Sequence, residues 1–258
     1  MIPKIIHYCW FGKNPIPEKV KKCIESWKRL CPDYKIICWN EENFDIEQFE
    51  YTKQAYSAKK WAFVSDVVRI KVIYEYGGIY LDTDVELIKN LDDLLAYDSF
   101  WAFENEKHIA TGLGFGAVAQ NKYVKLLLDD YSTRSFFDDK GVPNVIPCTD
   151  LNTQVFKKEG IAINNSLQVI DNNIFLPTEY MCPIDYETGK KNITHNTISI
   201  HHYDATWHTR KENFLHNFEK YSRRILGKRI SKKLTNFVIL LTNGGIIAVF
   251  NKIREKIV

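Results

Sequence analysis

Residues 62–84 constrain this chain more than any other part of its sequence. Apolar residues recur at helical spacing from Lys53 to Tyr76, and Gly77-Gly78 follows, where glycine readily takes the left-handed conformation past a helix end. Ile79-Tyr80-Leu81 then predicts a very short buried strand that leads directly into Asp82-Thr83-Asp84. This order of elements predicts a fold in which two carboxylates follow the end of a buried strand.

The rest of the chain alternates strands and helices in the manner of an α/β sheet. Residues 5–10 and 34–39 are predicted to be strands flanking a helical pattern at 17–30, a spacing that suggests parallel pairing. Further strands are expected within 100–119 and at 198–203, and helices at 123–131 and 151–158. With 258 residues, 45% of them hydrophobic and 26% charged, the chain can form one globular domain with a full core.

The acidic pair Asp82 and Asp84 predicts a site for a divalent metal. Side-chain alternation breaks down at a strand end, so two carboxylates two residues apart can converge on one cation. Mg²⁺ and Mn²⁺ prefer carboxylate oxygens and commonly retain positions for substrate phosphates. A metal there would bind a diphosphate and neutralise charge as it departs. Solvated loops often contain such a pair, so the preceding helix and strand give this one its specificity.

Asp66 and Arg69 lie three residues apart, so they share one face of the predicted helix. Most of that helix is apolar, and burying either charge is costly unless it is paired or bound to a polar group. Two interpretations follow from the residues alone. The two side chains form an ion pair that closes a core helix, or they bind a polar ligand.

The block from Asp66 to Asp84 resembles the DxD-containing sugar-binding region shared by bacterial capsular-polysaccharide glycosyltransferases and the fungal Golgi mannosyltransferases that initiate outer chains. It is more distantly similar to the glucosyltransferase domains of the large clostridial toxins. The opening IPKIIHYCWFG and the later HHYDATW also match the family pattern, so the resemblance spans residues 2–208. It implies an α/β domain of the GT-A type with a mixed central sheet, Mn²⁺ or Mg²⁺ as cofactor, and retention of anomeric configuration.

The resemblance also implies which residues bind a nucleotide-diphospho-sugar donor. Trp10 would stack on the nucleobase, and Asn43 would touch the nucleoside. Asp66 and Arg69 would contact the donor-sugar hydroxyls and the phosphate side, and Tyr80 would lie along the donor.

The same resemblance implies the catalytic and metal-binding residues. Asp82 would bind ribose and sugar hydroxyls beside the metal, Asp84 would coordinate it directly, and Arg69 would join them in stabilising the leaving diphosphate. One histidine completes the metal shell in similar enzymes, and here His202 is favoured over His201 for its spacing to the following loop. Trp207 of that loop would close over the donor. The small Ala-Gly-Ser stretch usual before this Trp is replaced by Asp204-Ala205-Thr206.

The C-terminal end is strongly basic. Residues 221–258 contain nine Lys and Arg but one acid, which leaves an acidic body that does not resemble a nucleic-acid binder. We expect a catalytic domain over 1–222 and an amphipathic helical tail over 223–258. Two apolar stripes occupy this tail: Ile230, Leu234, Phe237 and Leu241 in the first, and Ile246, Phe250, Ile253 and Ile257 in the second. The tail would contact an anionic membrane surface or pack on the body or on a second subunit.

The predicted function is transfer of a hexose, with a UDP-sugar favoured and GDP-mannose next, to a surface or capsular polysaccharide or a lipid-linked oligosaccharide. Three alternatives remain open: a non-catalytic nucleotide-sugar-binding module, a phosphodiester hydrolase that uses the acidic pair, and a toxin-like transferase acting on protein. The start lacks a signal-peptide pattern, no run of about 20 apolar residues occurs, and the six cysteines lack CxxC spacing. A cytoplasmic location is expected, with peripheral contact at the inner membrane face.

Overall fold

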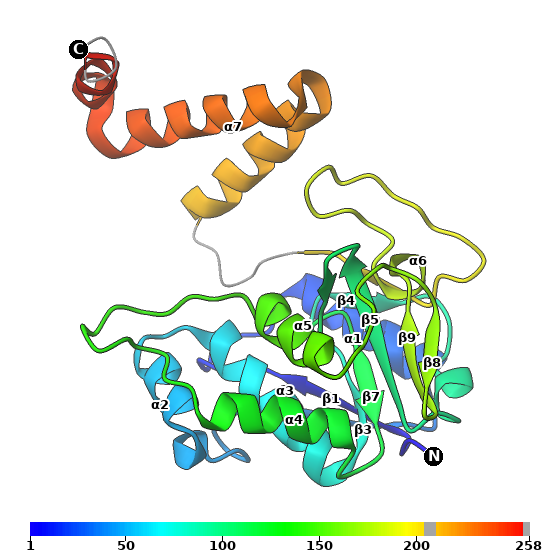
Figure 1. The fold of residues 1–258 in the computed structure, drawn as a ribbon. Coiled ribbons are helices and arrows are strands. Elements are labelled where there is room, and N and C mark those ends of the chain that lie inside the picture. Colours follow the sequence, from blue (N-terminus) through cyan, green and yellow to red (C-terminus); the bar gives the residue numbers. More distant parts are fainter. Residues whose placement is uncertain (204–209, 255–258) are drawn as a thin grey trace. The chain divides into compact units, whose positions relative to one another are not determined.

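The computed structural model of the protein describes residues 1–203 and 210–254 (Figure 1). These residues form two compact units. The first consists of Met1–Ile184 and Lys191–Tyr203, and the second of Asp185–Lys190 and Asp204–Val258. The sequence placed a domain boundary at residue 222, which lies inside helix α7 (Arg210–Arg254). That boundary stays a prediction.

The first unit is built on one mixed sheet with the strand order β2-β1-β3-β7-β5-β9-β8. Its strands are β1 (Ile5–Cys9), β2 (Lys35–Trp39), β3 (Gly78–Tyr80), β5 (Ser99–Asn105), β7 (Phe115–Ala117), β8 (Gln168–Ile170) and β9 (Asn173–Leu176), with β6 (His108–Ile109) paired to β5. Strands β2, β1 and β3 run parallel, whereas β7 pairs antiparallel with β3 and β5. The short strands β4 (Val85–Leu87) and β10 (Ser199–His201) form a separate antiparallel pair. The predicted mixed central sheet is confirmed.

Helices cover both faces of this sheet. Figure 1 shows α1 (Glu18–Leu30) on the opposite side of the sheet from α3 (Trp61–Tyr76) and α4 (Lys122–Ser132). Two buried apolar clusters correspond to these sides, one containing residues of α1 and the other residues of α3 and α4. The remaining helical segments are α2 (Glu50–Ser57), α5 (Cys148–Lys158), α6 (Thr178–Met181) and the 3₁₀ turns η1 (Ile46–Gln48) and η2 (Asp92–Leu94).

The single long helix predicted from Lys53 to Tyr76 is wrong: the segment forms two helices. Helix α2 ends at Ser57, and α3 begins at Trp61. Lys59 between them has a φ of +56°, in the left-handed region, which a right-handed helix cannot contain. Apolar spacing continues through the break, so the hydrophobic pattern alone could not reveal it.

The double glycine behaves as predicted. Gly77 and Gly78 have φ values of 64° and 102°, which end α3 and turn the chain into β3. A Cβ atom on Gly78 would lie 2.8 Å from the carbonyl oxygen of Ile5 and 2.9 Å from Nε2 of His7. Only glycine therefore fits where β3 starts beside β1.

His7 of β1 connects β2 to the end of α3 through two buried hydrogen bonds. The indole Nε1 of Trp39 donates to its Nδ1 at 3.0 Å, so the imidazole proton sits on Nε2, which donates to the carbonyl oxygen of Gly77 at 3.0 Å. The ring is fully buried. Burial lowers the pKa of His7 from 6.5 to about 4.

We predict that this histidine makes the fold less stable in mild acid. Between pH 6.5 and about 4 the unfolded chain binds a proton at His7 that the folded chain excludes, so stability falls as the pH falls through this range. The loss attributable to His7 should reach about 3 kcal/mol. Urea unfolding measured from pH 7 to pH 4 gives the slope. The matched variant His7→Asn, which stays neutral, should show a flatter profile, and identical slopes in both proteins would contradict the assignment.

Helix α7 in the second unit changes direction along its length (Figure 1), and Gly227 within it has a φ of 74°, which interrupts right-handed helical geometry. The tail predicted to be helical is thus helical. Ile257 lies outside the described residues, as do the side chains of Ile246, Phe250 and Ile253. Over the described part of the chain, no helix has the apolar length needed to cross a membrane.

Candidate functional site

Asp82 and Asp84 lie in a short turn between β3 and β4. The backbone N–H of Leu81 still bonds to His7 of β1 at 3.0 Å, whereas that of Asp82 turns to the carbonyl oxygen of Gly112 at 3.3 Å. The turn closes where the N–H of Val85 donates to the carbonyl oxygen of Asp82 at 3.0 Å. Both carboxylates are therefore fixed at the carboxyl end of a central strand, where α/β sheets commonly bind ligands.

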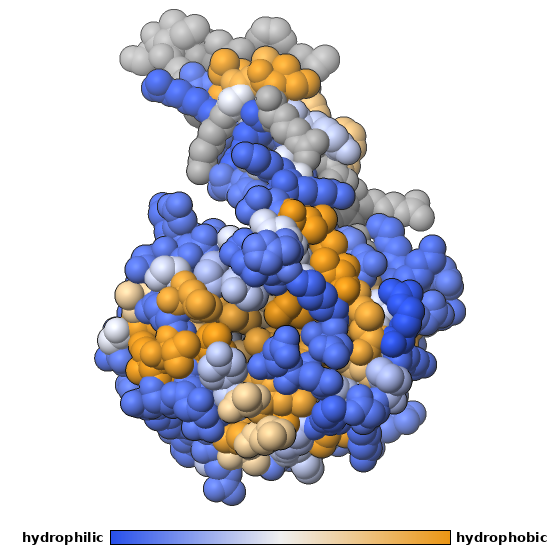
Figure 2. Space-filling model, turned by 90° about the vertical axis from the view of Figure 1, so that its right-hand side faces the viewer, coloured by the Kyte–Doolittle hydropathy of each residue, from blue (hydrophilic) through white to orange (hydrophobic). Residues whose placement is uncertain are grey.

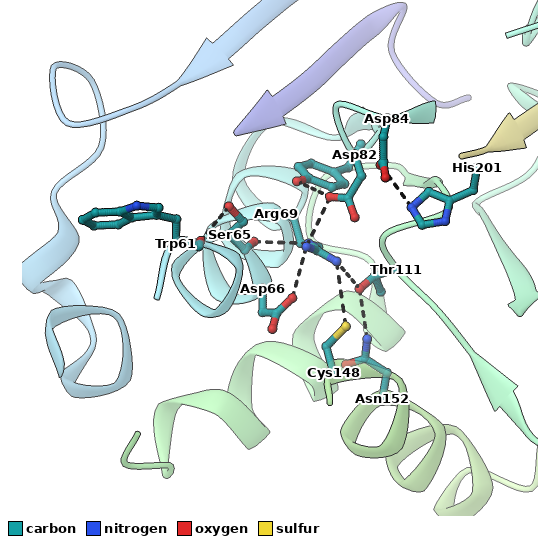
Figure 3. A network of polar contacts seen from close by, with 11 residues as sticks. Trp61, Ser65, Asp66, Arg69, Asp82, Asp84, Thr111, Cys148, Asn152 and His201 are labelled. Atoms are coloured by element: carbon teal, nitrogen blue, oxygen red, sulfur yellow. Dashed lines mark hydrogen bonds and ion pairs between the residues drawn. The ribbon is translucent and has the colours of Figure 1, made fainter. Parts of the chain in front are cut away.

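The guanidinium of Arg69 links this turn to helix α3 (Figure 3). Its Nη2 lies 3.1 Å from Oδ1 of Asp66 and 3.3 Å from Oδ1 of Asp82. The ion pair of Asp66 with Arg69, one of the two interpretations of the sequence, is therefore present, and it extends to the acidic pair. Arg69 is 4% exposed, so these charges interact with little screening by water.

Tyr80 holds the carboxylate of Asp82 from the other side. Its hydroxyl donates to Oδ1 of Asp82 at 2.8 Å, and its ring lies 5.0 Å from the guanidinium carbon of Arg69. Burial raises the pKa of the Tyr80 hydroxyl well above its ordinary value, so the hydroxyl remains a donor. Burial likewise raises the pKa of Asp82, while Arg69 acts to lower it. For Asp66, burial outweighs the guanidinium and raises the pKa to about 6.

Asp82, Asp84 and His201 can together hold a metal ion. One ligand atom from each lies within 4.8 Å of the other two, and Nε2 of His201 is 3.1 Å from Oδ1 of Asp84. Burial acts to lower the pKa of His201, but the nearby carboxylates, Asp84 foremost, raise it above its ordinary value. A divalent cation can take the place of that proton, because two carboxylates and an imidazole are ordinary ligands for such ions.

The structure places His201, rather than the preferred His202, beside the acidic pair. His201 is the last residue of β10 and faces the acidic pair, whereas the next side chain points elsewhere because neighbours in an extended segment alternate in direction. Nε2 of His202 instead lies 2.9 Å from Oε2 of Glu86 at the surface. Spacing to the following loop could not separate two adjacent histidines, whereas the pairing of β10 with β4 does.

The sequence did not identify the residues that contact Nη1 of Arg69 or their hydrogen-bond partner. The hydroxyl of Thr111 accepts from Nη1 of Arg69 at 3.3 Å and from Nδ2 of Asn152 at 3.0 Å, and the Cys148 sulfur lies 3.9 Å from the same Nη1. Residues 148 and 152 belong to α5, far from α3 in sequence (Figure 3). The sequence around these residues contains no pattern that predicts a role, because their contact with Arg69 forms only in the folded structure.

Gly112 lies against the carboxylate of Asp82. A Cβ atom there would stand 2.3 Å from Oδ2 of Asp82 and 3.3 Å from Nη1 of Arg69. Its φ is outside the left-handed region, so the backbone itself would accept another residue. The absence of a side chain is what lets the Asp82 carboxylate occupy its position.

The other predicted donor-binding residues lie on loops after β1 and β2. Because these strands are parallel to β3, Trp10 and Asn43 follow the same edge of the sheet as Asp82. The indole of Trp10 donates to the carbonyl oxygen of Asn14 at 2.7 Å. The amide of Asn43 donates to the carbonyl oxygen of Cys38 at 2.8 Å, so it stabilises its own loop. Their roles toward a donor stay predictions, and Trp207 lies outside the described residues.

A comparison with protein families identifies the same region of the chain. Residues 17–101 match the family model of the glycosyltransferase sugar-binding region containing a DXD motif. The resemblance to DXD-containing glycosyltransferases is thereby confirmed for residues 17–101, and Asp82-Thr83-Asp84 is the DXD motif of this segment.

Two curated relatives carry glycosyltransferase names. The chain is 40% identical over 107 residues to inositol phosphoceramide mannosyltransferase 3 of Schizosaccharomyces pombe, which covers 38% of the chain and 29% of that protein. It is 31% identical over 134 residues to inositol phosphoceramide mannosyltransferase 2 of the same organism, covering 50% and 38%. The chain thus spans well under half the length of each of these two relatives.

A solved structure resembles the fold. The PaToxG glycosyltransferase matches with a TM-score of 0.50 and 21% identity over 61% of this chain and 69% of its own. This likeness supports the glycosyltransferase type of α/β fold that the resemblance implied, with the DXD motif at the end of β3.

We predict that the two adjacent histidines differ sharply in metal binding. His201→Ala removes a candidate ligand and should weaken Mn²⁺ binding by about tenfold or more, whereas His202→Ala removes only a surface contact to Glu86. Calorimetric titration of Mn²⁺ into each variant measures both affinities. Equal losses in the two variants, or a larger loss in His202→Ala, would contradict the site.

A second prediction concerns Gly112→Ala. The added methyl group must displace the Asp82 carboxylate, so Mn²⁺ affinity should fall by about tenfold, and stability should fall as well because the carboxylate is pushed from its ion pair with Arg69. Gly160→Ala is the matched control. Its φ of 80° makes alanine strained, but no atom lies within 4 Å of the added group, so it should lower stability by about 1 kcal/mol and leave metal affinity unchanged. The reverse pattern would refute the steric account.

Proposed function

We propose that this protein is a metal-dependent glycosyltransferase that moves a hexose from a nucleotide-diphospho-sugar to a sugar or glycolipid acceptor. One observation carries the proposal: the DXD carboxylates converge with His201 on one position and connect, through Asp82, to the buried guanidinium of Arg69. A cation site beside a fixed positive charge suits a diphosphate leaving group. The match of residues 17–101 to a glycosyltransferase region supports it independently.

In this proposal the protein groups hold charge and orientation. A bound divalent metal would supply Lewis-acid stabilisation of the departing diphosphate. Arg69 provides a second positive charge that Asp66 and Asp82 keep in one place, so little reorganisation is needed when negative charge develops. Tyr80 fixes the direction of the Asp82 carboxylate by its hydrogen bond. The acceptor hydroxyl would attack from the face that the diphosphate leaves, with retention of configuration, as the resemblance implies.

The donor follows from two sources of support. The family resemblance favours a UDP-hexose first and GDP-mannose next, and the named relatives are mannosyltransferases. We therefore propose GDP-mannose and UDP-hexoses as the two donors to compare, with Mn²⁺ as the metal ahead of Mg²⁺ because an imidazole is among the ligands.

The proposed acceptor is a lipid-linked or surface oligosaccharide, of which a capsular polysaccharide is one kind. Relatives named for inositol phosphoceramide act on a glycolipid by their names, which favours an acceptor with a lipid part. We propose that the enzyme works in the cytoplasm at the inner face of the membrane, where such an acceptor would be reached.

The decisive experiment measures nucleotide release. Purified protein is incubated with GDP-mannose and a panel of UDP-sugars, with and without Mn²⁺. We expect nucleoside diphosphate from one donor, lost on chelation and lowered at least about a hundredfold in Asp84→Asn. Glu86→Gln is the matched control, because this neighbouring carboxylate pairs with His202 outside the metal cluster.

Each alternative has its own outcome. Nucleoside monophosphate as product would indicate a phosphodiester hydrolase. Donor binding by calorimetry without release, even with oligosaccharide and glycolipid acceptors present, would indicate a non-catalytic binding module. Sugar transfer to protein alone would indicate the toxin-like activity. Full activity of Asp84→Asn, or full activity in excess chelator, would remove the metal from the mechanism.

A further inference from the structure

The described part of helix α7 has its polar and apolar sides exchanged relative to an ordinary surface helix. Beyond Gly227, the buried positions are Ser231 and Thr235, at 0% and 5% exposure. Ile230 and Phe237 are 53% and 46% exposed. A surface helix of a water-soluble domain normally buries its apolar stripe, so this helix leaves its apolar side without the contacts that such a stripe usually makes.

Hydrogen bonds fix this orientation within the unit. The Ser231 hydroxyl lies 2.6 Å from that of Ser222 and donates to the carbonyl oxygen of Glu219 at 2.9 Å, which joins the helix after Gly227 to the helix before it. Ser231 and Thr235 are four residues apart and share the inward face. Ile230, Leu234 and Phe237, spaced by four and three, share a different face and form what we call the apolar stripe.

Positive charge accompanies the apolar stripe. Arg229, Lys232 and Lys233 are exposed on the same helical segment. Over residues 221–258 the sequence contains nine Lys and Arg and one acid. Figure 2 shows orange apolar surface directly beside blue hydrophilic surface on the helical unit.

We infer that this segment of α7 binds an anionic membrane surface, with the apolar stripe in the interfacial layer and the cations at the lipid phosphates. An exposed apolar face flanked by Lys and Arg is the pattern of helices that lie in the membrane interface. The described helices lack a membrane span, so this contact is peripheral. A second copy on the same face would bring two strongly basic segments together, a repulsion that anionic lipid replaces with attraction.

This inference adds a docking surface to the proposed transferase, and the binding itself does not require the transfer reaction. A protein that binds vesicles without releasing nucleotide would retain the docking surface and lose the proposed function. A protein that releases nucleotide from a donor but does not bind vesicles would retain the proposed function and lose the docking surface.

The test is flotation of the full chain with phosphatidylcholine vesicles that do or do not contain phosphatidylglycerol. We expect binding to the anionic vesicles only, weakening with added salt because the attraction is screened. Lys232→Gln with Lys233→Gln should lower the partition coefficient about tenfold or more. The apolar variant Ile230→Ser, Leu234→Ser, Phe237→Ser should lower it at least as far.

Matched controls lie on the first unit. Lys22→Gln with Lys28→Gln removes the same charge from exposed positions of α1, and Val142→Ser with Val145→Ser removes exposed apolar side chains outside α7. Both should bind as the unchanged protein does, and circular dichroism should be the same for all variants. Equal binding to both vesicle types, equal losses in the controls, or no binding to either vesicle would overturn the inference. So would a dimer in light scattering that the apolar variant converts to a monomer.

Discussion

The buried guanidinium of Arg69 is the interaction on which the arrangement of the site depends. It meets Asp66 on its own helix, Asp82 at the end of β3, and Thr111 before β7. Removing one partner of a buried ion pair typically costs about 3–5 kcal/mol, because the other charge is left without compensation. Arg69 therefore cannot be exchanged without disturbing the fold, and its structural and chemical roles are inseparable.

The charges around Arg69 also explain why a cation fits. Asp66 and Asp82 pair with the Arg69 guanidinium, and Asp84 joins Asp82 in the metal cluster, so these three carboxylates outnumber the one positive charge when His201 is neutral. Two pKa shifts reduce this excess of negative charge. Burial raises the pKa of Asp66, and the nearby carboxylates raise the pKa of His201. A divalent ion and a diphosphate would change this balance together, since the ion adds the positive charge that the diphosphate then shares.

The sequence predicted the parts of the fold that local chemistry controls. Gly77-Gly78 ends a helix and begins β3 because no other residue fits those dihedral angles beside Ile5 and His7. Asp82 and Asp84 follow that strand, as expected. The break at Lys59 was missed because apolar spacing runs through it. Spacing could not decide between His201 and His202, because which histidine faces the acidic pair depends on how β10 pairs with β4.

The residues around Arg69 come from positions 66, 82, 111, 148 and 152, so the site has no local origin along the chain. Contacts between such distant segments form slowly, since each requires a long loop to close first. The Arg69 guanidinium can make all of these contacts only after β3, β7 and α5 have assembled. The metal cluster likewise needs Asp82 and Asp84 to meet His201, so acquisition of metal affinity during refolding would report a late stage of folding, while helix content would report an early one.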